Sequence, residues 1–199
     1  AQRSQAELGV EIQQRGPVDD AAAHAAGSQA RQAELDQAAA PALALAGLAV
    51  AQALERFGVV GLQLKWPHDV LVNGEKLVGL LVELSTGHAR GLAAVIGIGI
   101  NLRLPPDVRI EAQTGVTDLA RALDGDVPSR PALLAAILAE LERLCATYAS
   151  GGFPALKDAW EQRNAFAELP VRISGDHTAL EGICAGVDDD GALLLQIGR

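Results

Sequence analysis

The sequence predicts an α+β fold, in which helices pack on a mixed, mostly antiparallel sheet and a small β domain follows. Three observations predict it. Apolar residues at helical spacing occupy residues 41–57 and 130–152. Between these two segments, residues 61–102 form short alternating or continuous apolar runs around an Asn-Gly pair. Residues 169–198 contain only short strand-like runs and turn residues.

The helix ends are marked by proline and glycine. Pro41 suits the first turn of a helix over residues 41–57, and Gly58 suits the position after its end. This segment is apolar on most faces, so we expect it to be buried. The alanine-rich residues 21–40 are compatible with a helix but have no clean apolar face. Further helices are predicted over residues 117–123, 130–152 and 153–164.

The strand predictions centre on Asn73-Gly74, because both residues tolerate the positive φ of a tight hairpin turn. The pair predicts a hairpin over residues 69–84, preceded by a short strand over 61–66. Residues 93–102, AAVIGIGINL, are continuously apolar, which predicts a strand buried on both faces. The turns SGD and DDDG separate the C-terminal runs, and these predict a small domain of the SH3-like barrel type.

Composition and charge exclude several classes of protein. The chain has 199 residues, is 49% hydrophobic and carries a formal net charge of -9, so it is a poor partner for nucleic acid. Cys145 and Cys184 lie far apart without zinc or disulfide spacing, so we expect two reduced thiols and no metal site. The sequence contains no signal-peptide core and no apolar run of membrane-spanning length. We therefore expect a cytoplasmic protein without nucleic-acid or membrane partners.

Two lysines stand at the edges of two apolar segments in KWPHDVLVNGEKLVGLLVE. Lys65 follows an alternating strand, and Lys76 lies one hairpin arm later. Each alone is an ordinary surface lysine at a strand end. Across a hairpin, however, the two ammonium groups could approach one site and favour an anion such as a phosphate. Asp69 could bind a hydroxyl or amine nearby, or merely balance the charge.

The segment IGIGIN contains a G-x-G pattern, but no third glycine opens a helix after it. A dinucleotide site is therefore not predicted. The favoured interpretation is a buried strand in which Gly97 and Gly99 avoid steric crowding. The alternative is that both glycines let a ligand approach the backbone, with Asn101 as a hydrogen-bonding end.

Taken together, these segments resemble biotin–protein ligases. Residues 65–83 closely match that family's signature K-W-P-N-D-[ILV]-x-x-x-x-x-K-[LV]-x-G-[IL]-L-x-E, and IGIGINL resembles its V-x-G-[IV]-G-[ILV]-N strand. WEQRNAFAELPVRI and EGICAGVDDDGALLLQ resemble its small C-terminal β domain. The resemblance covers about residues 41–199. Lipoate ligases share a related catalytic fold, but the KWP block and the tail favour biotin.

The resemblance implies a catalytic domain of the class II synthetase-like, biotin ligase fold over residues 1–164. It also implies an SH3-like β domain over residues 165–199, which stops short of the family's last strand, and no N-terminal DNA-binding domain. The implied activity is that of an ATP-dependent biotin–[biotin carboxyl-carrier protein] ligase. Biotin and ATP first give biotinyl-5′-AMP, and a lysine of the carrier domain then takes the biotinyl group. Mg²⁺ would enter with ATP, and a homodimer is compatible with an exposed sheet edge.

The resemblance also assigns site residues. Lys65 would be the catalytic cation at the α-phosphate, with Asp69 as the second catalytic residue. Lys76 would meet the biotin carboxylate or its adenylate, and Gly79 and Leu80 would offer backbone groups to the biotin ring. The remaining assignments are Trp66, Gly97, Gly99 and Asn101 for the nucleotide, and Ser4, Gly27 and Arg31 for biotin or the adenylate. No residue is assigned to a metal.

The sequence departs from the family pattern at His68, where the family has Asn, and upstream of residue 41. The family's S-T-N and its G-R-G-R-x-G-R biotin loop are not recognisable, and the region near 24–40 reads AGSQARQAELD. Either the loop has been lost or the chain is incomplete. A literal loss predicts weak or leaky activity. The alternatives are a catalytically weak module that binds biotin or a carrier domain, and a lipoate-type acyl ligase.

Overall fold

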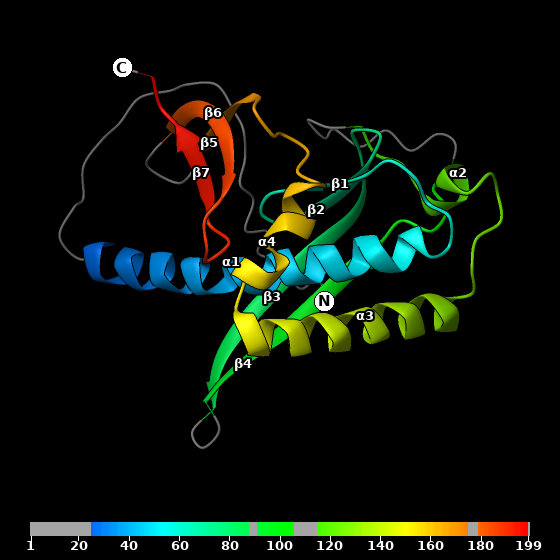
Figure 1. Ribbon diagram of the computed structural model, residues 1–199, viewed down its shortest axis with the longest axis horizontal. Coiled ribbons are helices and arrows are strands. Elements are labelled where there is room, and N and C mark those ends of the chain that lie inside the picture. Colours follow the sequence, from blue (N-terminus) through cyan, green and yellow to red (C-terminus); the bar gives the residue numbers. More distant parts are fainter. Residues whose placement is uncertain (1–24, 88–90, 106–114, 175–178, 199) are drawn as a thin grey trace, which may run out of the picture.

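The computed structural model describes residues 25–87, 91–105, 115–174 and 179–198 (Figure 1). A four-stranded sheet has the order β1-β2-β3-β4, and a three-stranded sheet has the order β5-β6-β7. All strand pairs in both sheets are antiparallel, which confirms the predicted α+β fold. The elements are α1 (Ala25–Glu55), β1 (Leu62–Lys65), β2 (Asp69–Val72), β3 (Glu75–Gly87), β4 (Gly91–Ile100), α2 (Leu119–Ala122), α3 (Arg130–Gly151), α4 (Pro154–Glu161), β5 (Pro170–Ser174), β6 (Ala179–Val187) and β7 (Leu193–Gln196).

Helix α1 is longer than predicted. It begins at Ala25 and contains Pro41 in its interior, so the prediction that the helix starts at Pro41 is wrong. Alanine has the highest helix propensity, and the alanine-rich residues before Pro41 extend the helix despite the hydrogen bond that proline removes. The predicted end is confirmed. Gly58 has φ 92°, and its N–H donates to Glu55 O at 3.0 Å.

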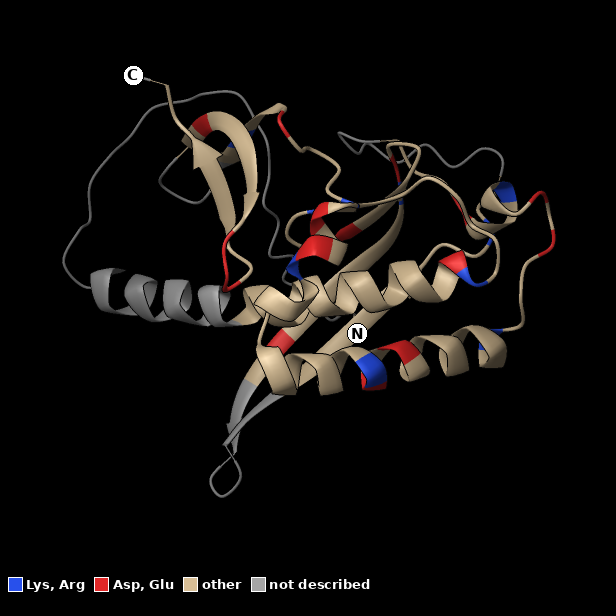
Figure 2. Ribbon diagram, viewed as in Figure 1, with Lys and Arg blue, Asp and Glu red and all other residues tan. Residues whose placement is uncertain are grey.

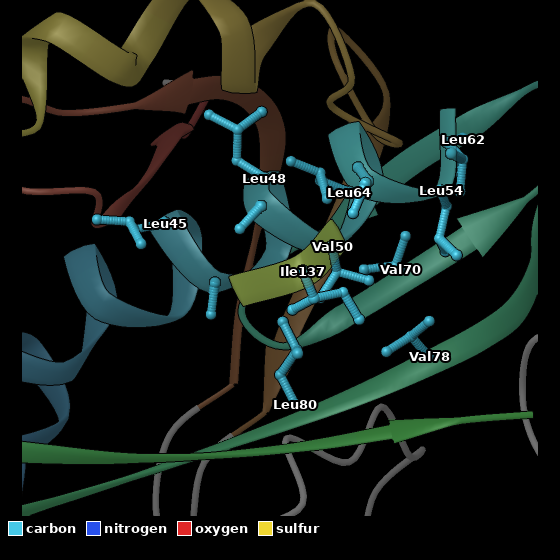
Figure 3. Packing of buried hydrophobic residues seen from close by; sticks show 14 of the residues in the cluster. Leu45, Leu48, Val50, Leu54, Leu62, Leu64, Val70, Val78, Leu80 and Ile137 are labelled. Carbon is cyan, nitrogen blue, oxygen red and sulfur yellow. The ribbon is translucent and has the colours of Figure 1, made fainter. Parts of the chain in front are cut away.

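The core lies between the helices and one face of the larger sheet. Figure 3 shows side chains from α1, α3 and the strands β1 to β3 meeting in one cluster. Leu48 and Leu54 of α1 and Val70 of β2 are completely inaccessible to solvent. Each such side chain stabilises the fold by about 1.5–3 kcal/mol relative to an exposed one. Burial of the segment after residue 41 is thus as predicted.

The hairpin prediction is confirmed at Asn73 and Gly74, which have φ of 50° and 83° and join β2 to β3. The prediction for β4 is wrong in one respect. Gly97 and Gly99 are exposed, and Val95 is 60% exposed, so the strand is not buried on both faces. Strand β4 is an edge strand in the described part of the chain, and helices cover only one face of the sheet.

The small C-terminal β domain is confirmed as a three-stranded sheet, but the described strands do not close into a barrel. The turn DDDG is also confirmed. Asp188 Oδ1 accepts hydrogen bonds from the N–H groups of Asp190 and Ala192, each at 2.9 Å. The predicted turn SGD falls largely on residues 175–178, which lie outside the described residues.

Charged residues are spread over the elements rather than gathered by sign. Figure 2 shows Lys and Arg singly placed, with Asp and Glu among them. Within the described ranges, no helix combines the length and the hydropathy that crossing a bilayer requires.

Candidate active site

Four of the predicted site residues form one row across the larger sheet. Lys65 pairs with Asp69, Asp69 with Gly79, and Gly79 with Gly99. Directly paired residues of antiparallel strands lie on the same face of a sheet. Their chain neighbours Leu64, Val70, Val78 and Leu80 point into the core. Because side chains alternate along a strand, the row lies on the face away from the helices.

Asp69 lies between the two lysines of this face. Its side chain is 6% exposed, and its Oδ2 lies 3.7 Å from Lys65 Nζ while its Oδ1 lies 2.6 Å from Lys76 Nζ. The expected approach of the two lysines across the hairpin is therefore seen in the structure. The shorter contact is an ion pair, because Oδ1 has no partner with hydrogen-bond geometry among the described residues. The carboxylate offsets the repulsion that would otherwise separate two cations.

Two features of the backbone bring Lys76 over this face. The register between β2 and β3 shifts between Val70 and Leu71, and a bulge of this kind re-aims the side chains beside it. Gly79 also lacks a side chain beneath the lysine. A Cβ built at Gly79 would lie 3.4 Å from Lys76 Cε and 3.5 Å from its Nζ. The Lys76 side chain therefore lies directly over Gly79.

His68 stands at the edge of the same cluster. Its Nδ1 lies 3.7 Å from Asp69 Oδ1, is buried, and has no hydrogen-bond partner in the described part of the protein. Burial lowers the pKa of His68 below its ordinary value of 6.5, and the charges of Lys76 and Lys65 lower it further, against the opposing effect of Asp69. His68 is therefore neutral at pH 7.

The backbone of this segment is held by β3. The His68 carbonyl accepts a hydrogen bond from Leu80 N at 2.8 Å. The side chain of Leu80 lies in the core. One backbone group of Leu80, a residue that the resemblance assigned to the biotin ring, is thus engaged within the protein.

Gly97 and Gly99 do not relieve crowding in this structure. A Cβ at Gly97 would lie 3.6 Å from Leu81 Cβ, and one at Gly99 would lie 3.7 Å from Gly79 O, which are ordinary contact distances. The interpretation favoured from the sequence is therefore not supported. Because both glycines are exposed, they leave the strand backbone open on the face that carries Lys65 and Asp69. This geometry agrees with the alternative of close ligand approach.

Asn101 connects three backbone segments beside the site. Its Nδ2 donates to Thr117 O at 3.1 Å and lies 3.5 Å from Lys76 O. Its own N–H donates to Leu77 O at 3.0 Å, and its carbonyl accepts from Leu119 N at 2.8 Å. The resemblance assigned Asn101 to the nucleotide, and the N–H groups of its side-chain amide are directed at backbone carbonyls. They fix the start of β3, which carries Lys76.

Asp118 is a buried carboxylate that the sequence interpretation missed. Its Oδ1 accepts from Arg121 N at 2.9 Å and its Oδ2 from Leu104 N at 3.0 Å. Burial alone would raise the pKa of Asp118, but these two hydrogen bonds and the charge of Arg121 outweigh it and lower the pKa. Asp118 is the N-cap of α2. An Asp three residues before Arg at the start of a helical run was the available signal.

Trp66 contacts the C-terminal sheet, which the sequence did not indicate. Its Nε1 donates a hydrogen bond to Gly191 O at 3.1 Å. The peptide bond between Trp66 and Pro67 is cis. The resemblance assigned Trp66 to the nucleotide, and its indole N–H is used inside the protein.

The three upstream assignments are Ser4, Gly27 and Arg31. Ser4 lies outside the described residues. Gly27 and Arg31 belong to α1, so the backbone there is helical and does not form the expected biotin loop.

Other features of the described surface lie away from the lysines. One open hollow lies on the C-terminal sheet around Arg172 and Glu181, and another lies at the end of α1 around Val60. In the described ranges, no group of three or more His, Cys, Asp or Glu side chains is placed to hold a metal ion. The Lys65–Asp69–Lys76 cluster is thus the arrangement that best combines charge with open backbone.

Comparisons with known proteins bear on this arrangement. The model of the Biotin/lipoate A/B protein ligase family matches residues 28–101. A biotin--[acetyl-CoA-carboxylase] ligase from Paracoccus denitrificans is 35% identical over 176 residues, covering 78% of this chain and 68% of the relative. The bifunctional ligase/repressor BirA from Bacillus subtilis is 33% identical over 153 residues, covering 76% of this chain and 47% of BirA. The chain therefore spans about half the length of that relative.

Solved structures show the same fold. The apo structure of biotin protein ligase from Aquifex aeolicus superposes with a TM-score of 0.68 at 25% identity, covering 78% of this chain and 67% of that one. The same enzyme in complex with biotin and ATP gives a TM-score of 0.67 at 25% identity, covering 78% and 64%. The resemblance seen in the sequence is confirmed, and the chain belongs to the biotin/lipoate A/B protein ligase family.

Proposed function

We propose that the chain is an ATP-dependent ligase that activates biotin as biotinyl-5′-AMP and transfers the biotinyl group to a lysine of a carboxyl carrier domain. The Paracoccus relative is named for ligating biotin to acetyl-CoA carboxylase, and the Aquifex neighbour was solved with biotin and ATP. The observation that carries the proposal is the convergence of Lys65 and Lys76 on Asp69, beside a sheet face left open by glycines.

The first half-reaction needs fixed positive charge. The biotin carboxylate attacks the α-phosphorus of ATP, the new P–O bond forms, and the bond to pyrophosphate breaks. Negative charge builds up on the α-phosphate oxygens during this step. A preorganised cation there lowers the barrier by about 2–4 kcal/mol. We assign that charge to Lys65, and we assign the biotin carboxylate to Lys76.

Asp69 supports this arrangement by holding both ammonium groups. It carries one negative charge between two positive ones, so the cluster keeps a net positive charge that attracts the anionic substrates. Because Asp69 is buried between the strands, its carboxylate has a fixed position, whereas the lysine side chains are partly exposed to solvent. Asp69 thus acts on the position of the lysines before any substrate enters.

The glycines provide the surface on which the substrates lie. Gly97 and Gly99 expose strand backbone, and Gly99 lies in the row that continues from Lys65 and Asp69. A flat ring can approach such a surface more closely than it could approach strands that carry side chains. In the second half-reaction, the carrier amine attacks the carbonyl carbon of the anhydride. The C–N bond forms, the bond to AMP breaks, and the amine proton passes to solvent.

Magnesium would supply further positive charge to the phosphates of ATP. Asp69 is a poor ligand for a resident ion, because both its oxygens already face lysine ammonium groups. No step is therefore assigned to a metal held by this chain, and Mg²⁺ would arrive with the triphosphate.

The proposal is tested by biotin-dependent exchange of labelled pyrophosphate into ATP. The parent chain should catalyse exchange, and Lys65→Ala should abolish it while biotin binding largely persists. Lys157→Ala is a matched control, because Lys157 pairs with Asp189 on the C-terminal turn and lies away from the cluster. Absence of exchange in the parent, with biotin binding retained, would favour a binding module instead.

A weaker activity is favoured by one observation. The region expected to form the arginine-rich biotin loop is helical from Ala25, with Gly27 and Arg31 inside α1. A site without that loop should retain the adenylate poorly, so we expect release of biotinyl-5′-AMP before transfer. Because the family model also covers lipoate ligases, competition between biotin and lipoate in the exchange assay identifies the substrate.

A further inference from the structure

A hydrogen bond joins the segment that carries the candidate active site to a turn of the C-terminal sheet. Trp66 directly follows Lys65, and its Nε1 donates to Gly191 O at 3.1 Å across 125 positions of sequence. The indole ring also packs against the hydrophobic core. Trp66 thus joins the end of β1 to the turn between β6 and β7.

That turn is itself held in place. Asp188 N donates to Ala192 O at 2.9 Å, which closes the turn, and Asp188 Oδ1 accepts from Asp190 N and Ala192 N. Gly191 has φ 79°, a conformation that residues with a side chain rarely adopt. The Gly191 carbonyl is therefore a fixed acceptor rather than part of a pliable loop.

The turn also rests on α1. A Cβ at Gly191 would lie 3.3 Å from Pro41 Cα and 3.4 Å from the carbonyl carbon of Ala40. These are backbone atoms of a helix, which cannot move aside as a flexible side chain would. The close approach of turn and helix, together with the positive φ, thus favours glycine at this position.

Other contacts attach the same sheet to α4. Lys157 Nζ lies 2.9 Å from Asp189 Oδ1, and Glu161 Oε1 accepts from Val187 N at 2.6 Å. Neither contact involves the segment between Lys65 and Asp69. They hold the sheet on the molecule, and they provide a control for contacts that do reach the site.

The segment from Trp66 to His68 is short and is held at both ends. At one end, Trp66 is bonded to Gly191, and at the other, the His68 carbonyl accepts from Leu80 N at 2.8 Å. Lys65 and Asp69 flank this segment directly. A shift of the Trp66 end therefore changes the separation and direction of the two charged groups.

We propose that Trp66 is a positioning residue, through which the C-terminal turn holds Lys65 and Asp69 in the geometry that adenylation requires. The effect on adenylation rests on the proposed function. The link between Trp66, the C-terminal turn and the Lys65–Asp69 segment rests only on the contacts described above. Trp66 itself does not touch the reacting atoms. This role differs from direct nucleotide binding, because it predicts an effect on the rate rather than on the affinity for ATP.

The first test combines two substitutions on opposite sides of the contact. Trp66→Phe keeps an aromatic ring and removes the donor, while Gly191→Ala displaces the acceptor and leaves Trp66 intact. A displacement of about 1 Å in a catalytic group can cost up to roughly 100-fold in rate. We expect each variant to lower kcat of pyrophosphate exchange about tenfold with little change in KM for ATP. The double variant should be no slower than the slower single one, since both break one contact.

Lys157→Ala removes a contact of the same turn that does not reach the site, and it should leave kcat within about twofold of the parent. A Trp66→Phe variant with unchanged kcat would overturn the proposal. A raised KM for ATP at unchanged kcat would also overturn it, because that result indicates direct nucleotide contact. Multiplicative effects in the double variant would show two independent contacts and would contradict it as well.

The second test does not depend on activity. Hydrogen–deuterium exchange at the Leu80 amide reports the position of the His68 carbonyl, to which it is bonded. Trp66→Phe and Gly191→Ala should each speed this exchange several-fold, and Lys157→Ala should not. If the parent lacks pyrophosphate exchange, the proposed function fails while this result still decides the structural coupling. Unchanged protection at Leu80 in both variants would overturn the inference, whether or not the chain is a ligase.

Discussion

Lys76 Nζ lies 2.6 Å from Asp69 Oδ1, although the two residues come from different arms of a hairpin and the register between those arms shifts beside them. The bulge and the missing side chain at Gly79 together make this contact possible. Lys65 approaches the other oxygen of the same carboxylate. One buried acidic residue therefore sets the spacing of the two cations.

Replacing the carboxylate should disperse the cluster. In Asp69→Asn, the side chain keeps its size but no longer attracts the lysines, which then repel one another. We expect pyrophosphate exchange to fall at least tenfold and the free energy of unfolding to fall by about 1–2 kcal/mol, a modest loss because both lysines reach solvent. Urea denaturation and the exchange assay measure the two effects. Asp126→Asn, an exposed position, is the control, and equal activity in both variants would contradict the role given to Asp69.

A side chain at Gly99 should block the substrate and spare the fold. Because the Cβ has ordinary contacts and valine favours strands, Gly99→Val should keep or slightly raise the melting temperature. The new side chain would project over the open face and should raise KM for biotin by at least tenfold. Gln196→Val, on an exposed strand of the other sheet, controls for added hydrophobicity. Normal KM in a folded Gly99→Val would show that biotin does not lie there.

Asn101 is expected to act through its amide donors. Asn101→Ala and Asn101→Asp both lose the N–H groups that face Thr117 O and Lys76 O. Each should reduce the free energy of unfolding by about 1–2 kcal/mol, because the part-buried carbonyl of Thr117 loses the Asn101 donor. Exchange of pyrophosphate should slow as Lys76 loses its fixed position. If Asn101→Asp kept full stability, the bonds to the carbonyls would not be what holds this strand.

Much of the fold could be predicted from local patterns. The Asn73-Gly74 turn determines the hairpin that brings Lys76 to Asp69, and the pairing of β1 with β2 brings Lys65 to the same carboxylate. The extension of α1 before Pro41 was not predictable, because alanine propensity and proline disruption oppose each other with similar magnitude.

The errors at the site have a common cause. Whether β4 is covered depends on the number of layers around the sheet, which its apolar composition does not reveal. The bonds from Trp66 to Gly191 and from Asn101 to Thr117 join positions far apart in sequence. The sequence around the donor does not indicate which residue is the acceptor, since the acceptors are backbone carbonyls that every residue possesses.

Protonation of His68 should contribute to the pH dependence of the free energy of unfolding. Its pKa in the folded protein is lowered from 6.5, first by burial and then by the lysine charges, so the unfolded chain binds more protons between the folded pKa and about 6.5. Stability contributed by neutral His68 is therefore fully present above pH 6.5 and is lost as the pH falls through that window. Melting temperatures of the parent and His68→Asn should differ in slope below about pH 6.5 and run parallel above pH 7. His24 and His88 lie outside the described residues, and His177 does also, so the comparison of the two proteins, rather than the parent alone, isolates His68. Identical slopes would show that the imidazole charges as freely in the folded protein as in the unfolded chain.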